Sequence, residues 1–291
     1  MRLSIWIEGA RPKTLIASIS PILIGSAIAF RNGNFNAAIL INALITGIFL
    51  QIGTNLANDY FDAKKGSDTE SRIGPRRIMQ SKLLRELTMK KAIFISFLIA
   101  TSSCVYLITQ GGPIISYLLA FAIILGIGYT AGPFALAYLG LGDIFVFFFF
   151  GCIATLMTTY LHTGEFLLEA FIAGIAPGAL STAILTTNNL RDQISDTLAS
   201  KKTLIARFGQ TFGKCEYTLL LTIAFLIPLI MSTIFNYNAL ILLTTSLSLY
   251  SLLLVKELWI AKTPHDFIPF LPKTSLLLTL YTLLFALGSL S

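Results

Sequence analysis

Two short polar segments hold most of the acidic side chains that could do chemistry in this chain of 291 residues. The first runs from Asn55 to Asp68 and follows a long apolar run. If a helix continues through it, Asn55, Asp59 and Asp62 stand at i, i+4 and i+7, on one helical stripe. Carboxylates about one turn apart repel each other unless a cation lies between them. Mg²⁺ suits such a site because it binds a few carboxylates and keeps its other positions for water and phosphate.

The second segment repeats this pattern after another apolar run. Asn188, Asp192 and Asp196 lie at i, i+4 and i+8. The chain has seven Asp residues, and five of them, Asp68 included, lie in these two segments. Because a chain so poor in acid places most of its aspartate at two points, we expect the two segments to form one site.

The composition is that of a membrane protein: 55% of residues are hydrophobic, 12% are charged and the mean hydropathy is +0.78. A soluble domain carries about twice this fraction of charged residues. Apolar runs of spanning length, about 20 residues, recur nine times. They cover residues 14–31, 36–54, 91–110, 113–131, 140–160, 166–187, 217–235, 239–258 and 273–290. We therefore expect one all-α, polytopic membrane domain over residues 1–291 with about nine transmembrane helices.

Basic residues are distributed unevenly between the segments that link these runs. With the N-terminus in the cytoplasm, the inner segments and the helix ends beside them hold 20 of the 21 Lys and Arg residues, all except Arg31. This is the usual bias of membrane proteins. It predicts a plasma-membrane protein whose N-terminus and aspartate segments are cytoplasmic. Basic loops beside anionic lipid explain the net charge of +7, and no nucleic-acid partner is expected.

Each aspartate segment is also rich in basic residues, over stretches that we expect to form loops at 55–90 and 188–214. Each segment ends an even-numbered predicted helix, and the two helices are four apart. This spacing predicts an internal duplication of a four-helix unit, which would bring the two segments face to face across a central cavity.

Facing aspartates, basic loops and an apolar cavity suit a diphosphate joined to a long hydrocarbon. Carboxylates hold Mg²⁺ against diphosphate oxygens, while Lys and Arg neutralise the remaining charge. Ionisation of an allylic C–O bond then gives a cation that needs electron-rich walls and little water. Tyr129, Tyr160 and some aromatic residues of 145–150 are candidates for these walls. Asp143, at a predicted helix start, is better explained as an N-cap.

These motifs resemble those of the UbiA superfamily of intramembrane prenyltransferases, on Asn58-Asp59-x-x-Asp62 and Asp192-x-x-x-Asp196. Longer runs are similar to the branch that prenylates 1,4-dihydroxy-2-naphthoate in menaquinone biosynthesis. They are Arg11 to Leu15, Asn55 to Asp68, Arg72 to Gln80, Gly140 to Asp143, Asn188 to Asp192 and Thr203 to Gly209. The last three predicted helices match only in being apolar.

The resemblance implies a ring of nine helices with a cavity open to the bilayer. It implies transfer of a polyprenyl chain from its diphosphate to the naphthoate ring with loss of CO₂, giving demethylmenaquinone, with Mg²⁺ as cofactor. The matching metal and diphosphate positions are Asn55, Asn58, Asp59, Asp62, Asp192 and Asp196. The matching basic positions are Lys65, Arg72, Arg77, Lys201 and Arg207. From the residue pattern we add Asp68 as a metal ligand and Asn188 as a substrate-binding residue. The chain departs from the family at Arg76, an extra arginine, and at Ser71, where an acidic residue is common.

Two other functions fit part of the pattern. One is prenylation of a different acceptor, such as 4-hydroxybenzoate, homogentisate, haem or another naphthoate, which composition does not separate. The other is cation-coupled transport, but transporters place coupling carboxylates near the bilayer midplane. Here the aspartates fall at helix ends beside basic loops, which favours a phosphorylated substrate.

Overall fold

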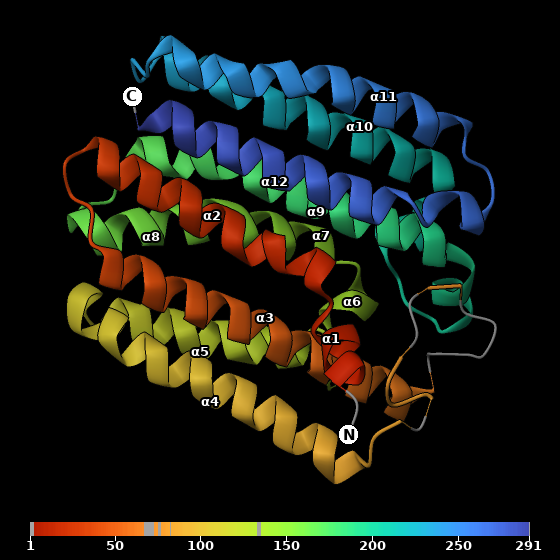
Figure 1. The fold of residues 1–291 in the computed structure, drawn as a ribbon. Helices are drawn as coiled ribbons and strands as arrows, with labels where there is room; N and C mark the ends of the chain where they lie inside the picture. Colours follow the sequence, from red (N-terminus) through yellow and green to blue (C-terminus); the bar gives the residue numbers. More distant parts are fainter. Residues whose placement is uncertain (1–2, 67–72, 75–76, 82, 133–134, 291) are drawn as a thin grey trace.

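The computed structural model describes residues 3–66, 73–74, 77–81, 83–132 and 135–290. Asp68 and Arg72, both expected in the site, lie outside these ranges, as do Ser71 and Arg76. Within the ranges the secondary structure is entirely helical. Figure 1 shows the long helices side by side, with their axes roughly aligned.

The long helices match the expected spans. The continuous ones are α2 (Pro12–Arg31), α3 (Ala37–Lys65), α4 (Glu86–Gly111), α9 (Leu168–Leu198), α10 (Leu204–Thr233) and α12 (Phe270–Ser289). Two more are composite: α7 (Gly142–Phe147), η1 (Phe148–Ile153) and α8 (Ala154–Thr163) run on without a break, as do η2 (Ala239–Leu247) and α11 (Ser248–Ile260). The short helices are α1 (Leu3–Ala10), α6 (Leu136–Leu139) and η3 (Pro264–Phe267).

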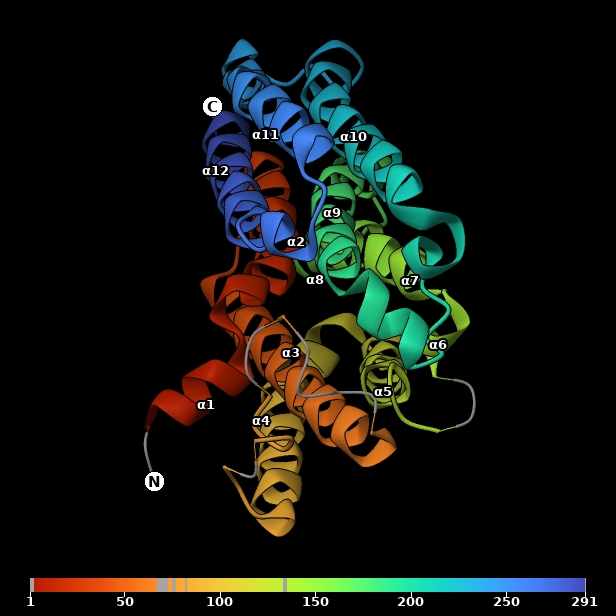
Figure 2. The same cartoon turned by 90° about the vertical axis from the view of Figure 1, so that its right-hand side faces the viewer.

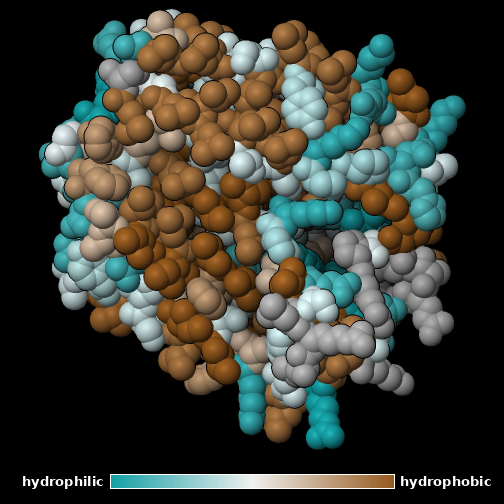
Figure 3. Space-filling model, viewed as in Figure 1, coloured by the Kyte–Doolittle hydropathy of each residue, from teal (hydrophilic) through white to brown (hydrophobic). Residues whose placement is uncertain are grey.

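Eight helical segments of the described chain are long and apolar enough to cross a membrane, and α5 (Pro113–Gly128) is a shorter apolar helix. Together they correspond to the nine expected spans, so the prediction of an all-α, multi-pass membrane protein is confirmed. Figure 3 agrees with this assignment, since apolar side chains cover the middle of the visible face. Hydrophilic side chains gather on the right, where the aspartate segments lie.

Both aspartate segments lie on helical extensions rather than in loops. α3 has 29 residues and α9 has 31, whereas about 20 span a bilayer. α3 ends only at Gly66, whose φ of 67° suits a residue without a side chain. The expectation of a loop over 188–214 was wrong, because α9 continues to Leu198 and α10 begins at Leu204. Residues 204–216 are too polar to be recognised as part of an apolar span, yet they form the first part of α10.

The helices form three groups when the end with the aspartate segments, which we call the motif end, faces the viewer (Figure 2). α10, α11 and α12 lie on one side, and α3, α4 and α5 on the other. α2, α7, α8 and α9 lie between these groups. The largest apolar core packs α2 and α9 against the three C-terminal helices.

The segment η1 packs backbone against backbone on α9. A Cβ added at Gly178 would lie 2.4 Å from the carbonyl oxygen of Phe147, and one at Gly151 would lie 2.4 Å from that of Gly174. Only glycine allows two membrane helices to approach this closely. η1 is also a π-helical turn, which holds one more residue than an α-turn. The contact with α9 therefore fixes the position of this irregular segment.

Candidate active site

The motif end of α3 is fixed by two buried asparagines. Asn55 donates from Nδ2 to the carbonyl oxygen of Ala10 at 3.0 Å. Asn58 accepts at Oδ1 from the hydroxyl of Thr130 at 2.9 Å. Both side chains are buried. The asparagines thus tie α3 to the α1–α2 junction and to the end of α5.

Asp59 holds the chain that follows α3. Its Oδ2 accepts from the backbone N–H of Ile78 at 2.9 Å, and its Oδ1 accepts from that of Met79 at 3.2 Å. Asp59 is 3% exposed and Ile78 is fully buried. This carboxylate therefore anchors residues 78–79 against α3, whatever else it binds.

Asp62 joins the two aspartate segments. Its Oδ1 lies 3.2 Å from Nζ of Lys201, which follows the second segment, and its Oδ2 lies 3.6 Å from Nη2 of Arg77, which follows the first. Tyr138 also donates its hydroxyl to Oδ1 at 3.4 Å. Asp62 therefore links the first segment to the basic stretch that follows the second, and the expectation that the two segments form one site stays a prediction.

Asp192 is paired with its sequence neighbour. Arg191 donates from Nε and Nη2 to the two oxygens of Asp192, both at 2.7 Å, and both side chains are buried. Asp196, one turn further along α9, is half-buried. Arg191 had no role assigned from the sequence, although its position beside Asp192 was a signal.

Tyr129 stands between the two segments at the end of α5. The carboxylates of Asp143, Asp196 and Asp62 are all close enough to interact electrostatically with its hydroxyl. A side chain at Gly142 would meet this hydroxyl, since a Cβ there would lie 2.7 Å from it. The tyrosine therefore lies near aspartates of both segments, and its expected role as an electron-rich wall for an allylic cation stays a prediction.

The other predicted basic residues lie further out. Lys65 donates to the carbonyl oxygen of Gly132 at 3.2 Å, and its ammonium lies 4.3 Å from the centre of the Tyr138 ring. Arg207 is exposed, and its guanidinium lies 5.5 Å from the ring of Phe208 on its own helix. Among the described carboxylates, none forms an ion pair with Arg207.

Two residues are not where the sequence interpretation placed them. Tyr160 donates to the carbonyl oxygen of Gly111 at 3.2 Å and stacks on Phe166, at the end of the molecule opposite the motif end. The structure does not bring it to the other candidates. Asp143 is not an N-cap, because α7 starts at Gly142 with Leu141 at the cap position. Its carboxyl is buried instead, and its Oδ1 has no hydrogen-bond partner within the described residues.

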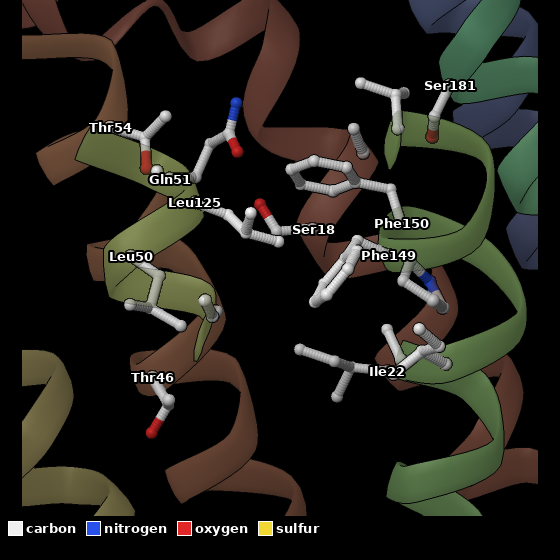
Figure 4. A pocket seen from close by; sticks show the side chains of 18 of the residues that line it. Ser18, Ile22, Thr46, Leu50, Gln51, Thr54, Leu125, Phe149, Phe150 and Ser181 are labelled. Atoms are coloured by element: carbon white, nitrogen blue, oxygen red, sulfur yellow. The ribbon is translucent and has the colours of Figure 1, made fainter. Parts of the chain in front are cut away.

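A cavity of about 380 Å³ opens beside this cluster, surrounded by α2, α3, α4, α5, η1, α8 and α9. At the motif end its lining is polar: Arg11, Asn55, Asn58, Tyr129 and Asn188. Towards the opposite end it is apolar: Cys104, Leu107, Ile115 and Leu161. Figure 4 shows Phe149 and Phe150 of η1 on one wall, facing Leu50 and Leu125 on the other. Such a site suits a molecule with an anionic head and an apolar body.

The aspartates fit Mg²⁺ in the kind of donor they offer. They supply carboxylate oxygens from two helices, and Mg²⁺ in proteins binds such oxygens and keeps part of its shell for water and phosphate. In the described part of the chain, no three His, Cys, Asp or Glu side chains meet at one point. Asp62 and Asp192 are instead neutralised by Arg77, Lys201 and Arg191.

The sequence profile of the UbiA prenyltransferase family matches residues 18–269 of the chain. A protein of Escherichia coli strain K12 named 1,4-dihydroxy-2-naphthoate octaprenyltransferase is 36% identical over 245 residues, which cover 82% of this chain and 79% of that protein. A protein of Haemophilus influenzae with the same name is 35% identical over 298 residues, which cover 99% of this chain and 96% of that protein.

Among solved structures, the fold is similar to that of a UbiA homolog from Archaeoglobus fulgidus bound to DMAPP and Mg²⁺. The TM-score is 0.63 at 14% sequence identity, and the match covers 96% of this chain and 98% of the other. At this identity the likeness concerns the fold alone.

Proposed function

Because this chain belongs to the UbiA prenyltransferase family, we propose that it transfers a polyprenyl chain from its diphosphate to 1,4-dihydroxy-2-naphthoate with loss of CO₂. The names of the relatives from Escherichia coli and Haemophilus influenzae support this acceptor. The observation that carries the proposal is the ion pair of Asp62 with Lys201, since it brings the first aspartate segment to the basic stretch that follows the second, at the polar end of an apolar cavity.

In this proposal the diphosphate binds at the motif end, where Lys201 and Arg77 pair with Asp62 and Arg191 pairs with Asp192. Charged hydrogen bonds to phosphate oxygens are the strong ones in proteins. Mg²⁺, held by Asp59, Asp62, Asp192 and Asp196, would act as a Lewis acid that neutralises the leaving diphosphate. Asp68 and Arg72 remain predicted contributors from outside the described residues.

The reaction balances without a proton acceptor. The allylic C–O bond breaks, and its electron pair leaves with the diphosphate. The ring carbon that carries the carboxylate forms the new C–C bond. The bond from this carbon to the carboxylate then breaks, CO₂ leaves, and the electron pair restores the aromatic ring. The product of this step is therefore the quinol, the reduced form of demethylmenaquinone. The site therefore needs to hold two substrates and exclude water, which the apolar cavity wall does.

We place the motif end in the cytoplasm, because 20 of the 21 basic residues lie on that side of the predicted spans. Lys202→Cys, in a chain whose Cys104, Cys152 and Cys215 have been replaced, tests the orientation. An impermeant thiol reagent should label this position in opened membranes and fail in intact cells. Ready labelling of intact cells would overturn the orientation.

The activity is tested with purified protein, Mg²⁺, polyprenyl diphosphates and a panel of aromatic acids, with products identified by mass. We expect a product equal to the naphthoate plus the prenyl group minus CO₂. Removal of Mg²⁺ by a chelator should stop the reaction, and its return should restore it. Prenylation of 4-hydroxybenzoate alone would refute the proposed acceptor and leave the reaction class intact.

A further inference from the structure

One polar side chain in the cavity has no part in the site described so far. Gln51 of α3 is half-buried and lines the cavity. Its amide makes no hydrogen bond with any residue that the structure describes. A ligand that covered this amide without bonding to it would lose about 1–3 kcal/mol. The position therefore suits a ligand that brings its own polar group.

The cavity has polar side chains on both of its walls: Gln51 lies on one, and Ser181 lies on the other, beyond Phe150 (Figure 4). Figure 4 shows Gln51 and Ser18 on the side opposite Phe149 and Phe150, with the amide directed into the space between. Ser18 already donates to the carbonyl oxygen of Leu15, at 3.2 Å. Ser181, also in the lining, is 3% exposed, and its hydroxyl has no partner in the described chain.

The position of Gln51 along α3 favours one class of ligand. Gln51 lies one turn from Asn55, about 6 Å along the helix axis at 1.5 Å per residue, on the side away from the aspartates. This is about the width of an aromatic ring. A polyprenyl tail has no polar atom to offer the amide, whereas the aromatic acceptor carries hydroxyl groups.

We propose that Gln51 binds the 4-hydroxyl of the naphthoate acceptor, and that Phe149 and Phe150 confine the ring. The inference rests on the proposed function, from which it takes the acceptor. The acceptor carboxylate is drawn to the motif end, where Arg11 lines the cavity. The 4-hydroxyl, the one further from the carboxylate, then reaches deeper, towards Gln51. An amide both accepts from and donates to a hydroxyl, so it satisfies this group fully.

The test pairs a protein change with a ligand change. Gln51→Met keeps the length of the side chain and removes its hydrogen bonds. 1-Hydroxy-2-naphthoate lacks only the 4-hydroxyl, which is meta to the reacting carbon and so alters its reactivity little. We expect the wild type to have a roughly tenfold lower KM for the dihydroxy acceptor, as one lost hydrogen bond implies. Gln51→Met should remove this preference and leave the KM for the prenyl diphosphate unchanged.

Thr46→Val is the matched control, since Thr46 lines the same cavity from α3 but already donates its hydroxyl to the carbonyl oxygen of Ala100. It should keep the preference. Phe150→Ala should weaken both acceptors equally, because it removes ring contact and no hydroxyl partner. Binding of the two naphthoates without prenyl diphosphate, followed by their own fluorescence, gives the same comparison when a variant turns over poorly.

The outcomes separate the two proposals. An equal preference in the wild type and in Gln51→Met overturns the role of Gln51 while leaving the reaction in place. A wild type that prenylates neither naphthoate refutes the proposed function itself. A loss of preference in Gln51→Met alone supports the inference.

Discussion

Lys201 and Asp62 form an ion pair, 3.2 Å from Nζ to Oδ1, although Asp62 belongs to the first aspartate segment and Lys201 follows the second. The side chains are 12% and 3% exposed, respectively. This pair links α3 to the connection between α9 and α10. The second basic stretch therefore places one charge directly against a buried carboxylate of α3, and whether this charge serves the reaction is a prediction that kinetics can test.

The first prediction concerns this lysine. Lys201→Gln should lower kcat/KM for the prenyl diphosphate by about 10- to 100-fold, because a charged hydrogen bond in a buried site contributes about 1.5–3 kcal/mol. Lys202→Gln is the control, since Lys202 is adjacent and exposed. Steady-state kinetics on both variants decide the matter. Equal behaviour of the two would mean that the stretch serves topology alone.

The second prediction separates the two roles of Asp59. Asp59→Ala leaves the N–H groups of Ile78 and Met79 without their acceptor, so it should cost about 2 kcal/mol of stability. It should also expose Arg77 to trypsin. Asp59→Asn keeps a carbonyl acceptor, so it should restore most of the protection while activity stays low. Asp196→Ala, the control, should leave cleavage at Arg77 unchanged.

The idea that Asp59 anchors the chain after α3 is wrong if Asp59→Ala and the wild type are cut at Arg77 at the same rate. If Asp59→Asn is fully active, the residue acts as an anchor and the carboxylate charge is dispensable for Mg²⁺.

The third prediction tests the close packing of η1 on α9. Gly178→Ala would drive a methyl group into the carbonyl oxygen of Phe147, at 2.4 Å. We expect a loss of 2 kcal/mol or more, of the order seen for overpacked cores, read as a lower thermal unfolding midpoint in detergent. Gly128→Ala is the matched control, because no atom lies within 4 Å of its added methyl. That variant should be neutral or slightly more stable.

The fourth prediction concerns Arg31, the one exception to the charge bias. It lies 3.7 Å from Glu169, donates to the carbonyl oxygen of Asn236 at 3.1 Å, and stacks on Tyr237 at 4.0 Å. Arg31→Gln should therefore destabilise the end opposite the motif end by about 1 kcal/mol, with both substrate KM values unchanged. Lys256→Gln, at an exposed position of α11, should alter neither stability nor kinetics. A thermal midpoint for Arg31→Gln equal to that of the wild type would show that the contacts of this arginine do not contribute to stability.

The fold followed from the sequence because hydropathy reports burial in lipid directly. Each apolar run became a helix, and the helical spacing of Asn55, Asp59 and Asp62 gave a stripe that the structure buries. The helical stretch 204–216 was missed, since its apolar residues are interrupted by polar ones and form no continuous apolar run. The helix is also kinked at Gly209, where φ is 87°, so its first residues do not read as one helix with the apolar run that follows.

The site was only partly predictable, because residue type indicates chemistry but not the direction of a side chain. The aspartates were identified as candidates because the chain has few of them and most lie in two short segments. The pairing of Asp192 with Arg191 and the position of Tyr138 under Lys65 depend on side-chain directions. Tyr160 was a plausible aromatic wall by type, yet it lies on α8 past the apolar part of the cavity. Gln51 belongs to no sequence motif, and a role for it can be proposed only because it lines the cavity.

The π-helical turn at Phe148–Ile153 makes the shape of the cavity sensitive to the loss of a single residue. A π-turn has one residue more than an α-turn, so deletion of one codon here would restore a regular helix. α8 would keep its rotational phase against α9, and the glycine contacts could re-form. The segment that carries Phe149 and Phe150, which line the cavity, would then be one residue shorter. If Phe149 and Phe150 confine the acceptor as we propose, an insertion or deletion in η1 changes the choice of acceptor without any substitution at the aspartates.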